Sequence, residues 1–230
     1  KYSIFIGIKM TNSTNPLAKY FRQPQIYIKL PSEGKWYPPG TLELPVTKEV
    51  PVLAMTAKDE LMLKVPDALM NGQAVVDVIE HCMPNIKNGW AVPSLDIHAI
   101  LIAIRLATYG ERMTTSITFG EDLDMDYDVD LHVVLDRLMS QIQWDTVVPI
   151  STDLTVYVKP IDYRQLSKTA IQTFETQKIM QAVNDDTVSE DEKVRIFKES
   201  FNRLTEVTVG TIVASVYKID SSAEIGRAHV

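Results

Sequence analysis

The stretch that decides the fold is residues 94–110, SLDIHAILIAIRLATYG. Its central part, residues 99–104, is apolar on every side, which is typical of a helix surrounded by protein rather than one lying at a surface. Ser94 is a favourable N-cap residue, Asp96 falls in the first turn, and Gly110 follows the last turn, where a left-handed residue ends many helices. We therefore expect a buried helix here, at the centre of the domain.

Shorter patterns on both sides of this helix predict strands and further helices. Residues 26–30, IYIKL, alternate apolar and polar side chains as a half-buried strand does. Residues 73–83 repeat apolar side chains with a helical period. Residues 114–131 contain two alternating runs joined by a short acidic turn, and residues 145–161 contain another strand pair. Residues 162–218 are predicted to be largely helical.

Together these patterns predict an α+β fold, with β-hairpins around a buried helical core and a mostly helical C-terminal region. We expect an N-terminal arm in residues 10–24, an α+β core domain in residues 25–160, and a helical region, expected to be truncated, in residues 161–223. Residues 1–9 lack an initiator Met and are expected to be a non-native or upstream extension. Residues 224–230, EIGRAHV, translate a common sequencing adapter and are excluded from the fold.

Composition excludes several classes of protein. The 230 residues are 45% hydrophobic and 23% charged, as in ordinary globular proteins. The net charge is −7 without a Lys/Arg stripe, so we expect neither a nucleic-acid nor a membrane partner. No apolar run approaches the ~18 residues that span a bilayer. Cys82 is the single cysteine, which leaves no internal disulfide or thiolate zinc site and fits a reducing compartment.

An acidic run in residues 121–130 is the strongest candidate for a metal site. A calcium loop needs a glycine for its sharp turn and a bidentate acid at its end, and this run has neither an internal Gly nor a closing Glu. We therefore favour a solvated strand face and predict no metal and no cofactor. A metal-dependent enzyme that uses residues 122–130 with His132 is the less favoured alternative. The acids concerned are Glu121, Asp122, Asp124, Asp126, Asp128 and Asp130.

His81 and Cys82, with Asp77 and Glu80 nearby, form the strongest candidate for nucleophilic catalysis. Adjacent residues on a helix point about 100° apart, so His81 and Cys82 cannot bond to each other as base and nucleophile. Cys82 lies on the apolar helix face and is expected in the core, and His98 is expected to be a core or boundary histidine. No hydrolase, zinc-protease, Walker or Rossmann motif is present. We predict no catalytic residues and no enzymatic activity.

Residues 25–45, QIYIKLPSEGKWYPPGTLELP, are the strongest candidate for an interaction site. They predict a strand, a turn, an aromatic pair, a rigid Pro-Pro-Gly corner and a second short strand. Trp and Tyr are favoured interface anchors; the alternative is that both rings fold back onto the hairpin's own core. We predict a docking or packing hairpin, whose interface residues are Lys29, Pro31, Trp36, Tyr37 and Pro38.

Three segments carry a resemblance to a known family. They are residues 10–40, 55–88 and 96–111, and their most specific parts are KLPS (residues 29–32), PDALMNGQAVVDVI (residues 66–79) and ILIAIRLATYGE (residues 100–111). From residue 10 to about residue 222 the chain resembles the baseplate hub family of T-even-type, contractile-tailed phages (myoviruses). Some members carry a cysteine pair in the interval that corresponds to residues 111–127. This chain has none there, so its hairpin must be closed by other means.

The resemblance implies a virion structural protein or a tail-assembly protein. Such a protein is made in the host bacterial cytoplasm and located in the hub of the tail baseplate, where it packs against other hub proteins in a hetero-oligomeric assembly. The resemblance implies no catalytic residues. The alternative within the same family is a transient hub assembly factor, or chaperone, that is absent from the mature virion.

Overall fold

The computed structural model describes residues 22–119, 123–140, 146–182 and 189–221, which form a mixture of helices and small antiparallel sheets and confirm the α+β prediction. Residues 1–9, residues 224–230 and most of the expected N-terminal arm lie outside the described residues. The helices are α1 (Ala57–Met62), α2 (Pro66–Met70), α3 (Gln73–Cys82), the 3-10 helix η2 (Gly89–Ala91), α4 (Ser94–Tyr109), α5 (Leu131–Ser140), α6 (Tyr163–Ala182) and α7 (Glu190–Ser215). The strands are β1 (Ile26–Lys29), β2 (Glu49–Val52), β3 (Arg112–Phe119), β4 (Leu123–Asp130), β5 (Val147–Ser151), β6 (Leu154–Val158) and β7 (Val216–Ser221).

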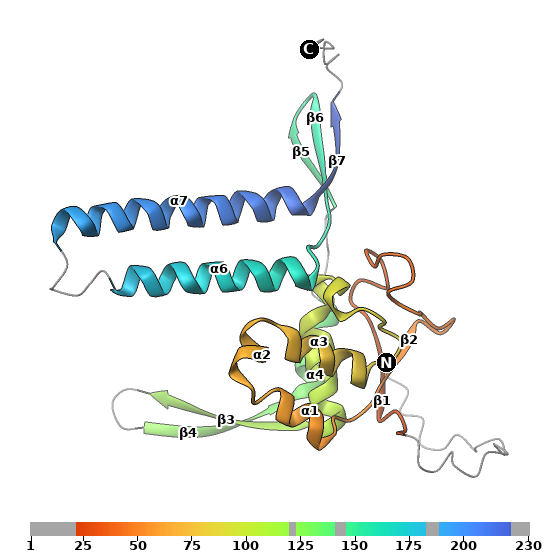
Figure 1. Ribbon diagram of the computed structural model, residues 1–230. Helices are drawn as coiled ribbons and strands as arrows, with labels where there is room; N and C mark the ends of the chain where they lie inside the picture. Colours follow the sequence, from red (N-terminus) through yellow and green to blue (C-terminus); the bar gives the residue numbers. More distant parts are fainter. Residues whose placement is uncertain (1–21, 120–122, 141–145, 183–188, 222–230) are drawn as a thin grey trace, which may run out of the picture.

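Helix α4 lies at the centre of the helical core, as its sequence predicted (Figure 1). It ends as expected at Gly110, whose φ is 86°. It begins at Ser94, and Pro93 rather than Ser94 takes the N-cap position. The Ser94 N–H donates instead to the carbonyl of Ile161 at 2.8 Å, which ties the helix start to the chain before α6. His98 is exposed, so the expectation of a core or boundary histidine was wrong; it lies on the face opposite the buried side chains.

The core forms where α3 and α4 pack against the β1–β2 ribbon. Alternation along each strand sends Ile28, Val50 and Val52 inward. Full burial of such a side chain stabilises the fold by about 1.5–3 kcal/mol relative to exposure. The buried cluster consists of Ile28, Leu30, Val50, Val52, Val78, Ile79, Cys82, Met83, Ile86, Val92, Ile97, Ala99, Ile100, Ala103, Ile104 and Leu135.

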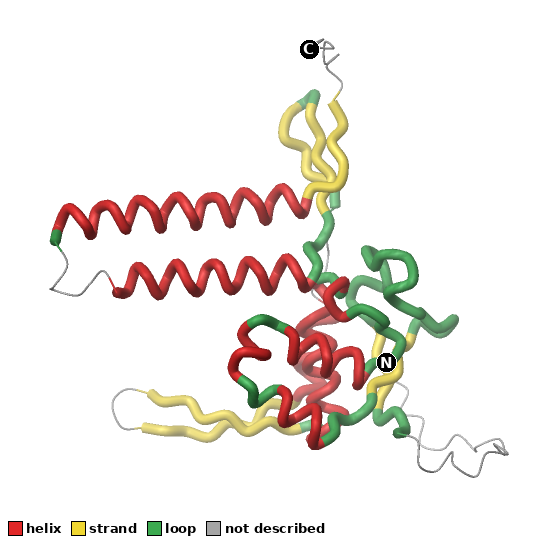
Figure 2. Tube along the Cα trace, in the orientation of Figure 1, coloured by secondary structure: helices red, strands yellow, loops and turns green. Residues whose placement is uncertain are grey.

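The partner of β1 differs from the predicted one. β1 pairs with β2, in the register Ile28↔Val50, and the predicted second strand in residues 41–45 lies in the long loop between them (Figure 2). Within that loop Leu42 forms an isolated bridge with Ile86. Residues 50 and 52 bury two valines against the core, and this burial explains the choice. The loop contains four prolines that cannot donate to a ladder, and β2 itself includes Pro51 opposite Tyr27.

The β3–β4 hairpin forms as predicted and extends away from the helical core (Figure 1). Eight residue pairs join its strands, from Arg112↔Asp130 to Phe119↔Leu123. Hydroxyl groups of β3 also donate across the ladder to acids of β4: Thr114 to Asp128 at 2.7 Å and Ser116 to Asp126 at 2.6 Å. Backbone pairing and these side-chain bonds hold the two strands together without cysteine.

The C-terminal region contains two long antiparallel helices and a small sheet. α6 and α7 run side by side and project to one side of the molecule (Figure 1). The sheet has the order β5-β6-β7. β7 lies in residues predicted to be helical up to Lys218, and this part of the prediction was wrong: its β-branched and aromatic side chains suit a strand, and β6 supplies the partner. The sheet therefore joins strands from both sides of the boundary predicted at residue 160.

Helix α6 is fixed to the core near the start of α3. Gly72 precedes α3 with φ 82°, and a Cβ placed on it would lie 2.6 Å from Ser167 Oγ of α6. Trp90 stacks on Tyr163 with ring centroids 5.8 Å apart, and the Arg164 guanidinium lies 5.2 Å from the Trp90 ring. The close approach of Gly72 and this stacked group determine where the helical pair leaves the core.

Candidate interaction surface

The long loop after β1 is anchored to the core by one buried carboxylate, that of Asp96 on α4. Its Oδ1 accepts the Ser32 N–H at 2.7 Å, while its Oδ2 accepts the Ser32 hydroxyl at 2.6 Å and the Tyr37 hydroxyl at 2.9 Å. Asp96 is 0% exposed. Burial raises the pKa of Asp96, although the bonds from Ser32 and Tyr37 oppose the rise. Burial, reinforced by the Asp96 charge, also raises the pKa of Tyr37.

Trp36 points back onto the chain's own C-terminal sheet. Its ring lies 5.4 Å from that of Tyr217 in β7, and Tyr217 in turn lies 6.1 Å from Tyr157 in β6. Trp36 has φ 71°, a left-handed conformation that is unusual for a bulky residue and here directs the ring toward the sheet. The aromatic pair thus has internal partners. These are Tyr217 of the C-terminal sheet for Trp36 and Asp96 of α4 for Tyr37, rather than the hairpin's own core.

The structure separates the five predicted interface residues into two groups. Lys29 and Pro38 are exposed, whereas Pro31, Trp36 and Tyr37 are half-buried. All five lie on β1 or on the first part of the loop that Asp96 anchors. A partner would therefore meet a preformed loop, which lowers the entropic cost of docking.

Helices α6 and α7 pack on each other through small and polar side chains. Thr176 on α6 and Ser200 on α7 are buried, and the hydroxyl oxygens of Thr169 and Thr211 lie 3.3 Å apart across the pair. The Thr176 hydroxyl donates within its own helix, to the carbonyl of Gln172 at 2.8 Å. Small residues let the two helices approach closely, and many of the larger apolar side chains consequently remain on the outside.

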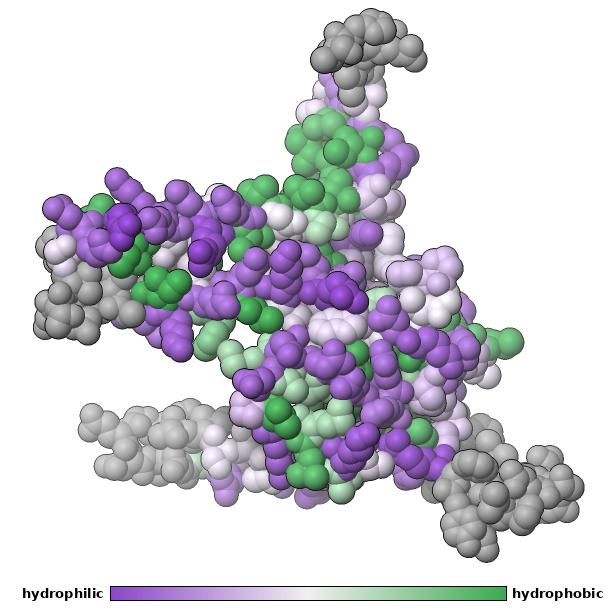
Figure 3. All heavy atoms as spheres, viewed as in Figure 1, coloured by the Kyte–Doolittle hydropathy of each residue, from purple (hydrophilic) through white to green (hydrophobic). Residues whose placement is uncertain are grey.

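The outer faces of this helical pair and of the β5-β6-β7 sheet are rich in exposed apolar side chains. Figure 3 shows hydrophobic residues gathered over the sheet and the adjoining end of α7. Phe197 and Phe201, one turn apart on α7, are 56% and 60% exposed. The exposed large hydrophobic residues of the region are Val147, Val148, Ile150, Phe174, Ile179, Val194, Phe197, Phe201, Val209, Ile212, Val213, Tyr217 and Ile219. Concentrations of this kind mark interaction surfaces in proteins.

Sequence reasoning missed this surface. A second apolar stripe on α7 was the available signal: Ile196, Leu204 and Val207 are half-buried, while Phe197 and Phe201 are exposed on the neighbouring flank. A helix with one neighbour needs only one stripe, so the second indicates another contact.

The acidic strand does not gather its side chains into a metal site. Asp126 and Asp128 are exposed and accept bonds from β3, while Asp130 accepts the His132 N–H at 2.9 Å. The His132 ring lies 3.6 Å from a carboxylate oxygen of Glu111 instead. Over the described ranges, no three His, Cys, Asp or Glu side chains are placed to hold a metal ion. Glu121 and Asp122 lie outside those ranges.

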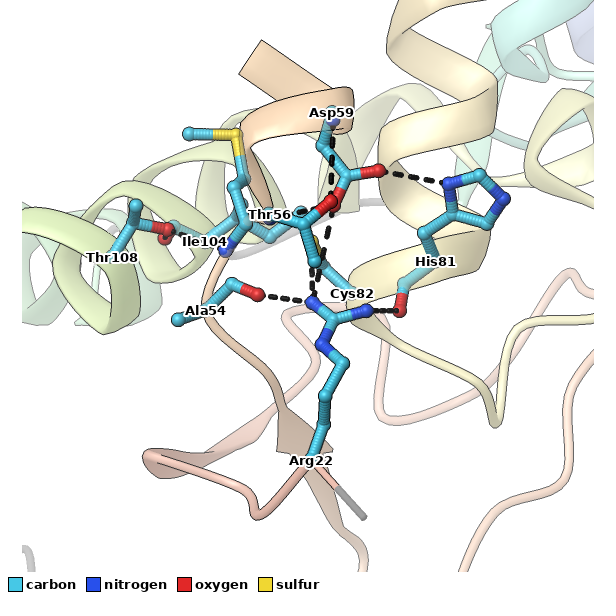
Figure 4. Close-up of polar contacts among 9 residues, drawn as sticks. Arg22, Ala54, Thr56, Asp59, His81, Cys82, Ile104 and Thr108 are labelled. Carbon is cyan, nitrogen blue, oxygen red and sulfur yellow. Dashed lines mark hydrogen bonds and ion pairs between the residues drawn. The ribbon is translucent and has the colours of Figure 1, made fainter. Parts of the chain in front are cut away.

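A second buried carboxylate, that of Asp59, organises the polar cluster at the start of α1 (Figure 4). Its Oδ2 accepts the backbone N–H and hydroxyl of Thr56 at 2.7 and 2.8 Å, and its Oδ1 lies 2.9 Å from His81 Nδ1. Arg22 donates to the carbonyls of Ala54 and His81 and approaches Asp59. Burial tends to raise the pKa of Asp59, but the bonds from Thr56 and His81 outweigh it and lower the pKa below its usual value.

This cluster does not activate Cys82. The thiol is fully buried, as predicted, and burial raises its pKa, whereas a reactive cysteine needs a lowered one. The adjacent His81 side chain is engaged by Asp59, not by the thiol. Asp77 and Glu80 accept bonds from Gln73 and from the Gly89 N–H. The group therefore joins the N-terminal chain at Arg22 to α1 and α3.

Comparison with known proteins supplies the family. A profile described as "T4 bacteriophage base plate protein" matches residues 23–221, and the chain therefore belongs to that family. No curated protein and no solved structure shows a significant match to the chain. Within the described residues, no helix has the length and apolar character needed to cross a membrane.

Proposed function

We propose that this base plate protein is a structural subunit of the baseplate hub in a contractile phage tail, acting by packing against other hub proteins. The family supports a structural role in the baseplate and a location in the virion tail. The hub position, the hetero-oligomeric assembly and the absence of catalysis belong to the proposal. Synthesis in the cytoplasm of the host bacterium is part of it as well.

The exposed apolar surface of α6, α7 and the β5-β6-β7 sheet is the observation that carries this proposal. Thirteen large hydrophobic residues are exposed there. Covering such side chains stabilises an assembly by about 25 cal/mol per Å² of apolar surface removed from water. The two long helices project from the core (Figure 1). They can therefore pack between neighbouring subunits without the core taking part in that contact.

The anchored loop contributes a second contact in this proposal, through Lys29, Pro31, Trp36, Tyr37 and Pro38. Trp36→Ala removes a ring that also packs on Tyr217, so the variant must be tested for stability and for assembly separately. We expect incorporation into tails to fall more than the unfolding free energy does. Normal incorporation of this variant would rule out a docking role for Trp36.

Quantitative mass spectrometry of purified tails tests the main proposal. A structural subunit gives peptides of this protein at near-stoichiometric level relative to known baseplate subunits. A transient assembly factor is abundant in the infected-cell lysate and absent from mature tails, and that outcome would replace the proposal with the alternative. No contact in the described residues favours the metal-dependent enzyme.

A further inference from the structure

The outer edge of β7 is a candidate for pairing with another strand. β7 is the last strand in the order β5-β6-β7, and among the described residues no strand pairs with its other side. An unpaired edge offers backbone N–H and C=O groups to any strand that can align with it. The sheet has only three strands, and side chains on both outer strands are exposed. So small a sheet gains from a further strand or a covering layer.

The two edges of this sheet are not equivalent. β5 contains Pro149, which lacks a donor, and a register shift interrupts its pairing between Pro149 and Ser151. Prolines and bulges are common devices that keep an edge unpaired. β7 contains no proline. Its pairing with β6 also has a register shift, at Tyr217, but Lys218, Ile219 and Asp220 pair with β6 in unbroken register. The β7 edge is therefore the one suited to pairing.

The charges on β7 favour pairing with a second copy of the same strand, and they favour the register centred on Ile219 over the registers centred on its two neighbours. Within one chain Lys218 Nζ already lies 2.7 Å from Asp220 Oδ2, so the pairing across copies would extend an existing ion pair. In an antiparallel pair with a two-fold axis normal to the sheet, one residue lies opposite its own copy. Centring the pair on Lys218 or on Asp220 places like charges opposite each other, which is unfavourable. Centring it on Ile219 places Lys218 opposite Asp220 of the second copy, and Asp220 opposite its Lys218. A parallel in-register pair would again oppose like charges.

The same register also extends an apolar row across both sheets. Val148, Val156 and Ile219 are neighbours across β5, β6 and β7. Opposite residues in a ladder share a face, so Ile219 of one copy would continue the row into Ile219 of the other. Charge and apolar pattern thus agree on one arrangement.

We propose that β7 pairs antiparallel with β7 of a second copy of this chain, centred on Ile219, to form a six-stranded sheet. The inference concerns the protein itself and does not depend on whether it remains in the tail. Because an edge of six residues buries less than the ~1,200 Å² of a standard interface, we expect a concentration-dependent dimer.

Disulfide trapping in the full chain tests the register. Ile219→Cys places two cysteines opposite each other at the ~4.5–5.5 Å Cα separation of directly opposed residues, which a disulfide spans. Ile150→Cys on β5 is the matched control, because both isoleucines are 61% exposed. Mild oxidation is expected to give a covalent dimer of the first variant and not of the second. Equal cross-linking of both, or none of either, would overturn the proposal.

Charge exchange provides an independent test. Because each substitution also removes the Lys218–Asp220 ion pair within the strand, circular dichroism must first show that each variant is folded. Lys218→Asp and Asp220→Lys each oppose like charges twice in a homodimer, so sedimentation analysis should show at least roughly tenfold weaker self-association than wild type. An equimolar mixture restores two attractive pairs and should form heterodimers at wild-type strength. Lys198→Asp and Glu206→Lys, exposed on α7, are controls for net charge. Mixed variants that associate no better than each variant alone would contradict the β7 pairing.

Discussion

Two buried aspartates bond to residues that are far away in the sequence. The residues next to each aspartate in the chain do not predict these contacts. Asp96 was expected as a first-turn residue of α4, where an acid interacts favourably with the helix dipole. In the structure it instead holds Ser32 and Tyr37, which lie 64 and 59 positions away in the sequence. Asp59 does cap its own helix with Thr56, a pairing that the three-residue spacing indicates, but it also engages His81 from α3. Local spacing predicts caps, whereas partners brought together by the fold require the structure.

The stabilising contribution of Asp59 should be lost in acid. Its pKa is lower in the folded state than the ~3.9 of an unfolded chain, so the folded protein binds this proton less readily. The stability that it contributes is present above the unfolded pKa and is lost as pH falls through the folded one. Asp59→Asn should therefore lower stability near neutral pH and flatten the decline in stability as the pH falls below about 5.

Urea unfolding at a series of pH values measures this difference. The exposed residue Asp67 on α2 supplies a matched control, and Asp67→Asn should keep the wild-type decline. If Asp59→Asn loses stability on acidification as steeply as wild type does, the bonds from Thr56 and His81 do not hold the Asp59 pKa down.

At the scale of elements, the sequence predicts helices better than strand partners. Helix α4 was identified from its own residues, because apolar pattern and end signals lie within one short segment. β7 was not, because a strand is defined by its neighbour, and β6 ends 58 positions before β7 begins. The same reason explains why β1 was assigned the nearer residues 41–45 rather than β2. The exposed apolar surface on α6 and α7 was not predicted, because the sequence does not show which face of each helix the other helix covers.

Gly72 should be the most sensitive glycine at the joint between the core and α6. An alanine there would combine a left-handed backbone, φ 82°, with a methyl group 2.6 Å from Ser167 Oγ. The backbone strain alone costs about 1–2 kcal/mol, and displacing α6 adds to it. We expect Gly72→Ala to lower the free energy of unfolding by about 2–4 kcal/mol in a urea titration.

Gly40→Ala is the matched control for this effect. Gly40 has a similar φ, 79°, but nothing lies within 4 Å of the added methyl group. It should therefore show the backbone cost alone, about 1–2 kcal/mol. Equal losses for the two variants would mean that α6 does not approach Gly72 as closely as the structure places it.

At the scale of the whole molecule, we expect stability and assembly to depend on different parts of the chain. The apolar residues around α4 are buried within the core, whereas those on the outer side of α7 face solvent. Apolar side chains that remain exposed contribute little to folding, and their burial becomes favourable when a neighbour arrives. The core should thus set the unfolding free energy, and the helical pair and its sheet should set association with the rest of the tail.

The double variant Phe197→Gln/Phe201→Gln tests this division. Because both rings are more than half exposed, the unfolding free energy should change by no more than about 0.5 kcal/mol. Incorporation into tails, measured by mass spectrometry of purified particles, should fall strongly, since the apolar contact is lost. Ile100→Ala in the fully buried part of α4 is the opposite control: it should cost about 2–5 kcal/mol of stability. Full incorporation of a stable double variant would move the docking surface away from this flank of α7, to the sheet or to the anchored loop.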